Sequence, residues 1–145
     1  MNWQKEAVND LRNYLPRKRA MESMRERKRA LEEKFQSIKC VTMDADPVKG
    51  GGSRMEDNLL NNITERERLD LNMKATARLL ALTEKGLEAL DERQRMVLHR
   101  FFVDRPQDHV GVLSEELHME KSRVYQLKDE ALYHFTIGMF GIADY

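Results

Sequence analysis

The chain has few of the residues that cross-link, kink or interrupt a fold. Among its 145 residues are one cysteine, Cys40, three prolines and seven glycines. A single cysteine excludes an internal disulfide and is typical of a reducing compartment, so we expect a cytoplasmic protein. So little proline and glycine argues against a turn-rich β protein and against a disordered chain.

Long apolar runs are missing as well. No stretch approaches the roughly 20 apolar residues that cross a bilayer. The first segment, Trp3 to Asn13, is already charged, unlike a secretory signal peptide. We therefore expect no membrane partner. Charged residues are abundant and make up 34% of the chain, and hydrophobic residues make up 41%. This composition favours an all-α fold.

The charges balance over the chain but not along it. The 25 basic and 25 acidic residues give a net charge of zero. Residues 1–50 hold 12 basic and 8 acidic side chains, whereas residues 91–145 hold 7 and 10. A basic excess is the usual electrostatic footprint of nucleic-acid binding. The C-terminal part lacks it, so DNA binding there would need charge or avidity from elsewhere.

Two long segments repeat their seam positions at heptad spacing. In Arg17–Lys39 the repeat comprises Met21, Met24, Lys28, Leu31, Phe35 and Ile38. In Met55–Leu90 it comprises Leu59, Ile63, Arg66, Asp70, Met73, Ala77, Leu80, Glu84 and Leu87. So narrow a stripe suits a partner helix, which predicts an antiparallel, coiled-coil-like hairpin over residues 1–89. Pro16 should interrupt or kink its first helix.

A connector should join the two helices of this hairpin. Residues 41–54 include Pro47 and three consecutive glycines, Gly50 to Gly52. These residues break both helix and strand, and they favour a flexible loop. A phosphate-binding loop would need Lys-Ser or Lys-Thr after its last glycine and a strand before it, and both are absent.

The segment from Leu113 to Phe135 has the pattern of two short helices joined by a tight turn. Leu113 and Leu117 lie one helical turn apart, and His118, Met119 and Glu120 break the periodicity. A second apolar stripe then begins, made of Val124, Leu127, Ala131 and Phe135. Two helices so spaced favour a helix-turn-helix, whose second helix can enter the DNA major groove.

A further helix should precede this motif. Asp91 followed by Gln94 is typical of a capping box, and the apolar residues after it predict a buried face. That face comprises Leu90, Val97, Leu98, Phe101 and Phe102.

Three helices in this order resemble region four of bacterial sigma-70 family factors, which reads the −35 promoter element. The resemblance runs from Leu90 to Phe135 and is most specific at RVYQLKDEAL, beside RVRQIEAKAL in the family. The layout of the whole chain is similar to the small sigma-like regulators of phages and prophages, of the ArpU and RinA kind. The chain departs from the family at the turn, where His118 replaces a glycine of positive φ. It departs again at the recognition helix, where Glu120 replaces a Ser or Thr cap and Tyr125 replaces an arginine.

The resemblance implies that the second helix of the motif contacts DNA. The residues expected at or near the groove are Lys121, Ser122, Arg123, Tyr125, Gln126 and Lys128. Glutamine can bond adenine bidentately, arginine or lysine can read guanine or bind phosphate, and tyrosine can touch a thymine methyl group. The alternative is that these are ordinary surface residues used for protein contacts.

Other chemistry has little support in the sequence. The four histidines lack metal-ligand spacing and have no cysteine or acidic company, so no metal and no other cofactor is expected. No catalytic grouping of Ser, His and Asp or of Cys and His is suggested, and we expect no enzyme. The basic run from Arg17 to Arg29 could grip phosphates or an acidic surface, or it could be the solvated face of a coiled coil.

These observations predict a two-part all-α protein. Residues 1–89 would form the hairpin with its loop at 41–54, and residues 90–145 the helix-turn-helix module with an apolar C-terminal tail. The expected function is a sequence-specific DNA-binding transcription regulator of phage or prophage type. Double-stranded DNA, RNA polymerase and a second copy in a homo-oligomer are the expected partners. The alternatives are a small-terminase-type DNA-recognition subunit of a phage packaging machine and a helical adaptor that binds proteins.

Overall fold

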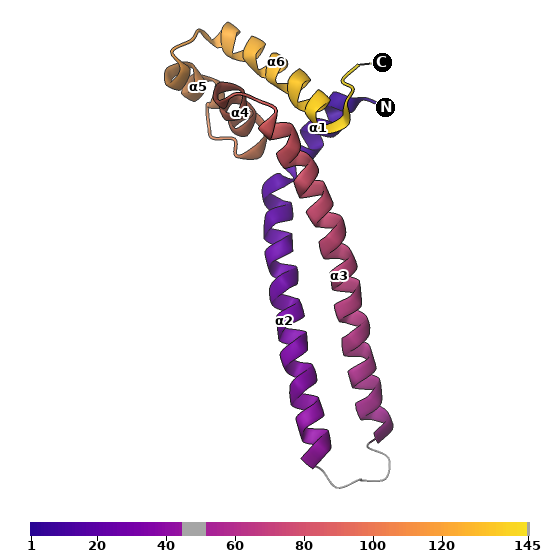
Figure 1. The fold of residues 1–145 in the computed structure, drawn as a ribbon. Coiled ribbons are helices and arrows are strands. Elements are labelled where there is room, and N and C mark those ends of the chain that lie inside the picture. The colour runs from indigo at the N-terminus through magenta and orange to yellow at the C-terminus, as the bar shows by residue number, and fades with distance from the viewer. Residues whose placement is uncertain (45–51, 145) are drawn as a thin grey trace. The chain divides into compact units, whose positions relative to one another are not determined.

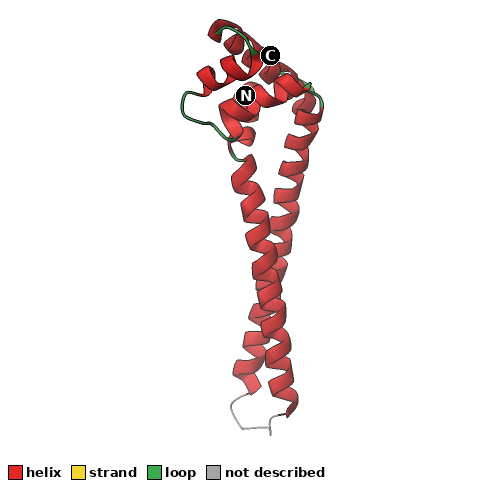
Figure 2. Ribbon diagram, turned by 90° about the vertical axis from the view of Figure 1, so that its left-hand side faces the viewer, coloured by secondary structure: helices red, strands yellow, loops and turns green. Residues whose placement is uncertain are grey.

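The computed structural model describes residues 1–44 and 52–144, and every regular element in these ranges is a helix (Figure 2). The prediction of an all-α protein is therefore confirmed. The elements are α1 (Trp3–Arg12), α2 (Tyr14–Asp44), α3 (Gly52–Glu88), α4 (Glu92–Leu98), the π-helical turn η1 (His99–Val103), α5 (His109–Leu117) and α6 (Lys121–Phe140) (Figure 1). None of the described helices has both the length and the apolar character that crossing a membrane requires.

The chain divides into two compact units, which we call the head and the helix pair. The head combines residues 1–18 with the residues from Arg78 onward, and the helix pair comprises Arg19–Ala77. The boundary expected between residues 89 and 90 followed chain order. The observed units are instead discontinuous in sequence, because the first 18 residues pack with the C-terminal helices.

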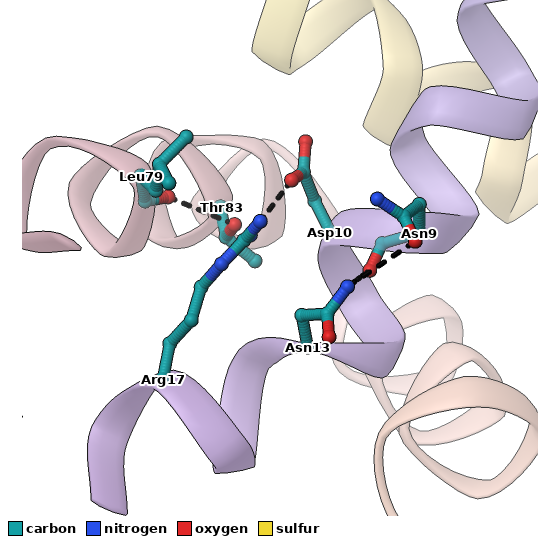
Figure 3. A network of polar contacts seen from close by, with 6 residues as sticks. All are labelled: Asn9, Asp10, Asn13, Arg17, Leu79 and Thr83. Carbon is teal, nitrogen blue, oxygen red and sulfur yellow. Dashed lines mark hydrogen bonds and ion pairs between the residues drawn. The ribbon is translucent and has the colours of Figure 1, made fainter. Parts of the chain in front are cut away.

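Pro16 separates α1 from α2, but the break lies three residues before it. A proline at this position cannot donate to the carbonyl of Arg12, and its ring would clash with that carbonyl in a continuous helix. The chain therefore turns at Asn13, whose side-chain amide donates to the Asn9 carbonyl at 2.8 Å (Figure 3). Pro16 then occupies the first turn of α2, where a missing N–H costs little.

An ion pair spans the same break. The Arg17 guanidinium, on α2, lies 2.7 Å from the carboxylate of Asp10, on α1 (Figure 3). Both side chains are largely shielded from solvent, with 22% and 13% of their surface exposed. This contact fixes the start of α2 against α1 within the head.

The larger core of the head joins both ends of the chain. Its buried members are Ala7, Leu11, Leu90, Leu98, Ala131, Leu132, Phe135 and Met139. The Trp3 ring of α1 lies 5.2 Å from the Phe140 ring of α6, so the first and last helices lie side by side (Figure 1). In the apolar C-terminal tail, Met139 and Ala143 are buried in the head, whereas Ile137 and Ile142 are exposed.

Two glycines let α3 and α6 approach closely in the head. A Cβ on Gly86 would lie 2.6 Å from Cγ of Met139 and 2.7 Å from Cε2 of Phe135. A Cβ on Gly138 would lie 3.2 Å from the Cα of Gly86. Any side chain at Gly86 would therefore overlap the fully buried Phe135 ring unless the helices separated.

The capping box predicted at the start of α4 is confirmed. Asp91 caps the helix by accepting from the Gln94 backbone at 2.8 Å, and the Gln94 side chain accepts from the Asp91 backbone at 3.2 Å. The helix continues into η1, where Asp104 donates to the His99 carbonyl over five residues. The wider turn directs Phe101 into one core cluster and leaves Phe102 in contact with two.

In the helix pair, the contacts between α2 and α3 run antiparallel. Lys28 pairs with Asp70 at 2.8 Å, and the buried Asn62 donates to the Leu31 carbonyl at 2.8 Å. The hydrogen bond and the charge of Asp70 raise the pKa of the Lys28 ammonium. The Arg66 guanidinium also stacks over the Phe35 ring. Polar groups thus account for much of this seam.

The seam of α2 follows the predicted heptad, but that of α3 shifts by one residue in places. Ile63 and Ala77 are exposed although the pattern placed them inside, and Asn62 and Thr76 face inward instead. In the head, Thr83 is buried and the predicted Glu84 is exposed. An ideal helix drifts relative to a seven-residue repeat, and polar residues on both sides left the sequence pattern unable to fix the register.

The expected connector is shorter than its predicted range of 41–54. Residues 41–44 belong to α2, and residues 52–54 belong to α3. The remainder, residues 45–51, lies outside the described residues, and so do Pro47 and two of the three glycines.

The glycine contact yields a first prediction. Gly86→Ala should lower the free energy of unfolding by about 1–2 kcal/mol, because overpacking against Phe135 outweighs the better helix propensity of alanine. Chemical unfolding followed by circular dichroism measures the effect. Ala81→Gly, at an exposed position of the same helix, calibrates the propensity contribution. A Gly86→Ala protein that is more stable than the parent would show that no close crossing exists.

A second prediction concerns the buried amide in the helix pair. Asn62→Leu should raise the unfolding free energy by about 1 kcal/mol, because the Leu31 carbonyl keeps its intrahelical partner and the new side chain is apolar. Asn62→Asp should lower it by about 2–3 kcal/mol by burying a charge. Urea unfolding of both variants, with Asn61→Leu as the exposed control, checks this. Destabilisation by leucine would contradict the seam position of Asn62.

Candidate nucleic-acid interface

The candidate interface is built on the turn between α5 and α6. His118 ends α5 in the left-handed region, with φ 54° and ψ 47°. Its backbone N–H and that of Met119 both donate to the Ser114 carbonyl. The Ser114 hydroxyl closes the turn by donating to the Met119 carbonyl. A positive φ therefore occurs at His118, the position where the resemblance led us to expect a glycine.

The two helices share a small apolar core. Its buried members are Val97, Phe101, Val110, Leu113, Val124 and Leu127. Leu117 and Met119 are half-buried against it. Because Val124 and Leu127 both face α5 and η1, the opposite side of the first two turns of α6 is directed to solvent.

The N-terminus of α6 lacks a side-chain cap. Glu120 occupies the cap position with an extended backbone, and its side chain accepts no bond from the first turn. The expectation that Glu120 is a poor cap is confirmed. The N–H groups of this turn lie beside Lys121 and Ser122, and the helix N-terminus carries a partial positive charge.

Four of the six predicted contact residues lie together on this exposed start of α6, and none of them forms an ion pair with a described residue. They are Lys121, Ser122, Tyr125 and Gln126, all exposed. Tyr125 has 48% of its surface accessible. These side chains provide hydroxyl, amide and ammonium groups, which can bond base edges or phosphates.

The other two predicted residues are engaged with acidic neighbours. The Lys128 ammonium lies 2.7 Å from the Asp129 carboxylate and stacks over the Phe101 ring, with 22% of its side chain exposed. Arg123 lies 3.4 Å from Glu130 and also donates to the Gln126 side chain at 3.3 Å. Both cations must therefore exchange a carboxylate for a phosphate before they bind DNA.

The buried Phe101 ring packs beneath the exposed face of α6 and contacts Tyr125, a role that the sequence pattern did not reveal. The rings of Tyr125 and His109 both meet it edge-on, at centroid distances of 5.9 and 4.6 Å. Arg105 donates to the His109 ring at 3.1 Å. Burial, and then the charge of Arg105, lower the pKa of His109. The π-turn that positions Phe101 leaves no clear sequence signal, because FFV also fits an α-helix.

The acidic excess of residues 91–145 is partly offset within the head. Residues 1–18 contribute four basic and two acidic side chains, and α1 contacts both η1 and α6. Arg12, which is exposed, lies over the Phe102 ring at 5.9 Å. This source of charge was missed because it lies about 80 residues away in the sequence.

The basic run divides between the two units. Arg17 is paired in the head, and Arg27 and Lys28 pair with Glu65 and Asp70 across the helix pair. Among the described residues, no group of three histidine, cysteine, aspartate or glutamate side chains is arranged to hold a metal ion.

Comparisons of the chain with known proteins found no matching family model, no curated protein and no solved structure of significant similarity.

Proposed function

We propose that the protein is a non-enzymatic, sequence-specific DNA-binding regulator of transcription, similar to region four of sigma factors and of phage or prophage type. In this proposal α5 and α6 act as a helix-turn-helix. The start of α6 enters the major groove, and the helix pair acts as a hairpin for assembly. A cytoplasmic location and a contact with RNA polymerase belong to the same proposal.

The observation that carries the proposal is the combination of a tight turn with an open helix face. The αL cap at His118 and the shared core of Leu113, Val124 and Leu127 hold α5 and α6 at a fixed angle. On the far side, Ser122, Tyr125 and Gln126 are exposed on successive turns. A helix held in this way can present its first two turns to base edges.

The charges support weak binding by one head and tighter binding by a pair. Lys128 and Arg123 are paired with carboxylates, and Asp129 is exposed one turn beyond Tyr125. Phosphate neutralisation supplies much of the affinity of DNA-binding proteins. A single head should therefore bind DNA with a dissociation constant of roughly micromolar or weaker at physiological salt. Dimerisation or docking on polymerase would supply the missing affinity.

The same charges favour a second candidate, a protein-binding adaptor. Asp129 and Glu130 add acidic groups to the solvent side of α6, where a DNA-binding helix would ordinarily be basic. An adaptor would bind a protein surface through this face with little dependence on salt. A packaging subunit of the small-terminase type would differ from both by forming rings on its DNA.

The test is a selection from random duplex DNA with the full chain, at stated salt, with and without RNA polymerase. Enrichment of one sequence motif supports the regulator. A ring-forming complex on a packaging-type site would favour the terminase type. No enrichment under either condition removes the DNA proposal and favours the adaptor.

Substitutions in α6 should separate base contacts from phosphate contacts. Gln126→Ala should cost about 1–3 kcal/mol on the selected site and relax the preference at one base position. Arg123→Ala should weaken binding to all sequences alike and reduce the salt dependence. Titrations against the selected site and a scrambled duplex measure both effects.

Gln36→Ala, at an exposed position of α2, is the matched control and should bind like the parent. If Gln126→Ala bound the selected and scrambled duplexes with parental affinities, α6 would not be the reading helix.

A further inference from the structure

A second heptad stripe runs along the outer side of α3. Its members are Asp57, Leu60, Thr64, Glu67, Leu71 and Lys74. All are exposed, and the two leucines have 66% and 68% of their surface accessible. Singly exposed leucines are common, but two on one stripe of a helix indicate a contact surface.

This stripe cannot contact α2 of the same chain. At about 100° per residue, Leu60 and Leu71 lie roughly 160–180° around the helix from Asn62, which faces α2. Within the described parts of the chain, Asp57, Glu67 and Lys74 have no ion-pair partner. The stripe is therefore an unpartnered helix face with unpaired charges at its two ends.

The two halves of the stripe are complementary to each other. Read inward from the two ends, Asp57 corresponds to Lys74, and Leu60 corresponds to Leu71. An antiparallel copy of α3, related by a two-fold axis between residues 65 and 66, would place each leucine on the partner's other leucine. The same axis would place each aspartate on a lysine. A parallel, in-register copy would instead oppose like charges.

We infer that the outer face of α3 is the surface on which a second copy of this chain docks, antiparallel and with two-fold symmetry. The pairing is isologous, since the same patch serves both copies. Leucine pairs flank its centre, and two Asp57–Lys74 contacts close its ends and fix the register. Ile63, which is also exposed, would lie against the aliphatic part of the partner's Arg68.

The thin core of the helix pair explains why a copy is needed. Among the described side chains of Arg19–Ala77, the buried ones are Met21, Leu31 and Asn62. Two helices with so little buried apolar surface gain stability when α3 also packs against the α3 of a second copy. The inference rests on the homodimerisation contained in the proposed function but not on DNA binding.

Disulfide trapping tests the register. In a Cys40→Ser background, the double variant Leu60→Cys/Leu71→Cys should form a covalent dimer on mild oxidation. An equimolar mixture of the two single variants should do so as well. Either single variant alone should not, because in an antiparallel pair two copies of one position are about 16 Å apart, beyond the reach of a disulfide.

Covalent dimers from a single variant alone would overturn the antiparallel arrangement. The absence of a covalent dimer from the double variant would overturn the surface itself.

Charge exchange tests the same contact without cysteine. In sedimentation equilibrium, Lys74→Asp should weaken dimerisation about tenfold, because two like-charge contacts replace two favourable ones. Adding Asp57→Lys should restore it. Leu60→Glu should weaken it about a hundredfold, since the change acts twice and desolvates a carboxylate.

Lys39→Asp and Val41→Glu, both at exposed positions of α2, are the matched controls and should dimerise like the parent. Circular dichroism should show full helicity for every variant. The inference would be overturned if the double charge exchange gave no rescue. It would also be overturned if the parent chain were monomeric at roughly 100 micromolar, a concentration that corresponds to a dimerisation free energy of roughly −5.5 kcal/mol. A monomeric chain that still binds its selected DNA would leave the DNA proposal standing.

Discussion

The buried face of α6 is the constraint on which the head depends. Its first half, through Val124 and Leu127, fixes α5 and the turn, and its second half, through Phe135, packs against α1, α4 and the end of α3. One helix therefore joins the candidate interface to the larger core. The glycine at residue 86 is what permits that contact, because any side chain there would force α3 and α6 apart.

Much of this arrangement was predictable from local patterns. The capping box at Asp91 and the apolar spacing from Leu113 to Phe135 each specify a helix end or a buried face by short-range chemistry. Both predictions are confirmed. The positive φ at His118, unlike the turn itself, was predictable only through the family resemblance, since histidine gives no direct signal for that conformation.

Other features depend on contacts that a linear pattern does not encode. The packing of residues 1–18 on α6 is a contact between the two ends of the chain, so the pattern assigned those residues to the hairpin. The seam of α3 was misplaced at Ile63 and Ala77 because polar residues on both sides blur the repeat. The contact between the rings of Tyr125 and Phe101 appears only when the helices are placed together.

If the start of α6 reads DNA as we propose, backbone amide NMR of the labelled full chain, titrated with a duplex selected by binding, should show chemical-shift changes concentrated at residues 121–126. These changes should scale with occupancy, and a scrambled duplex should give smaller changes at the same residues. Changes confined to the basic run of residues 17–29, or none at saturating DNA, would argue against DNA reading by α6.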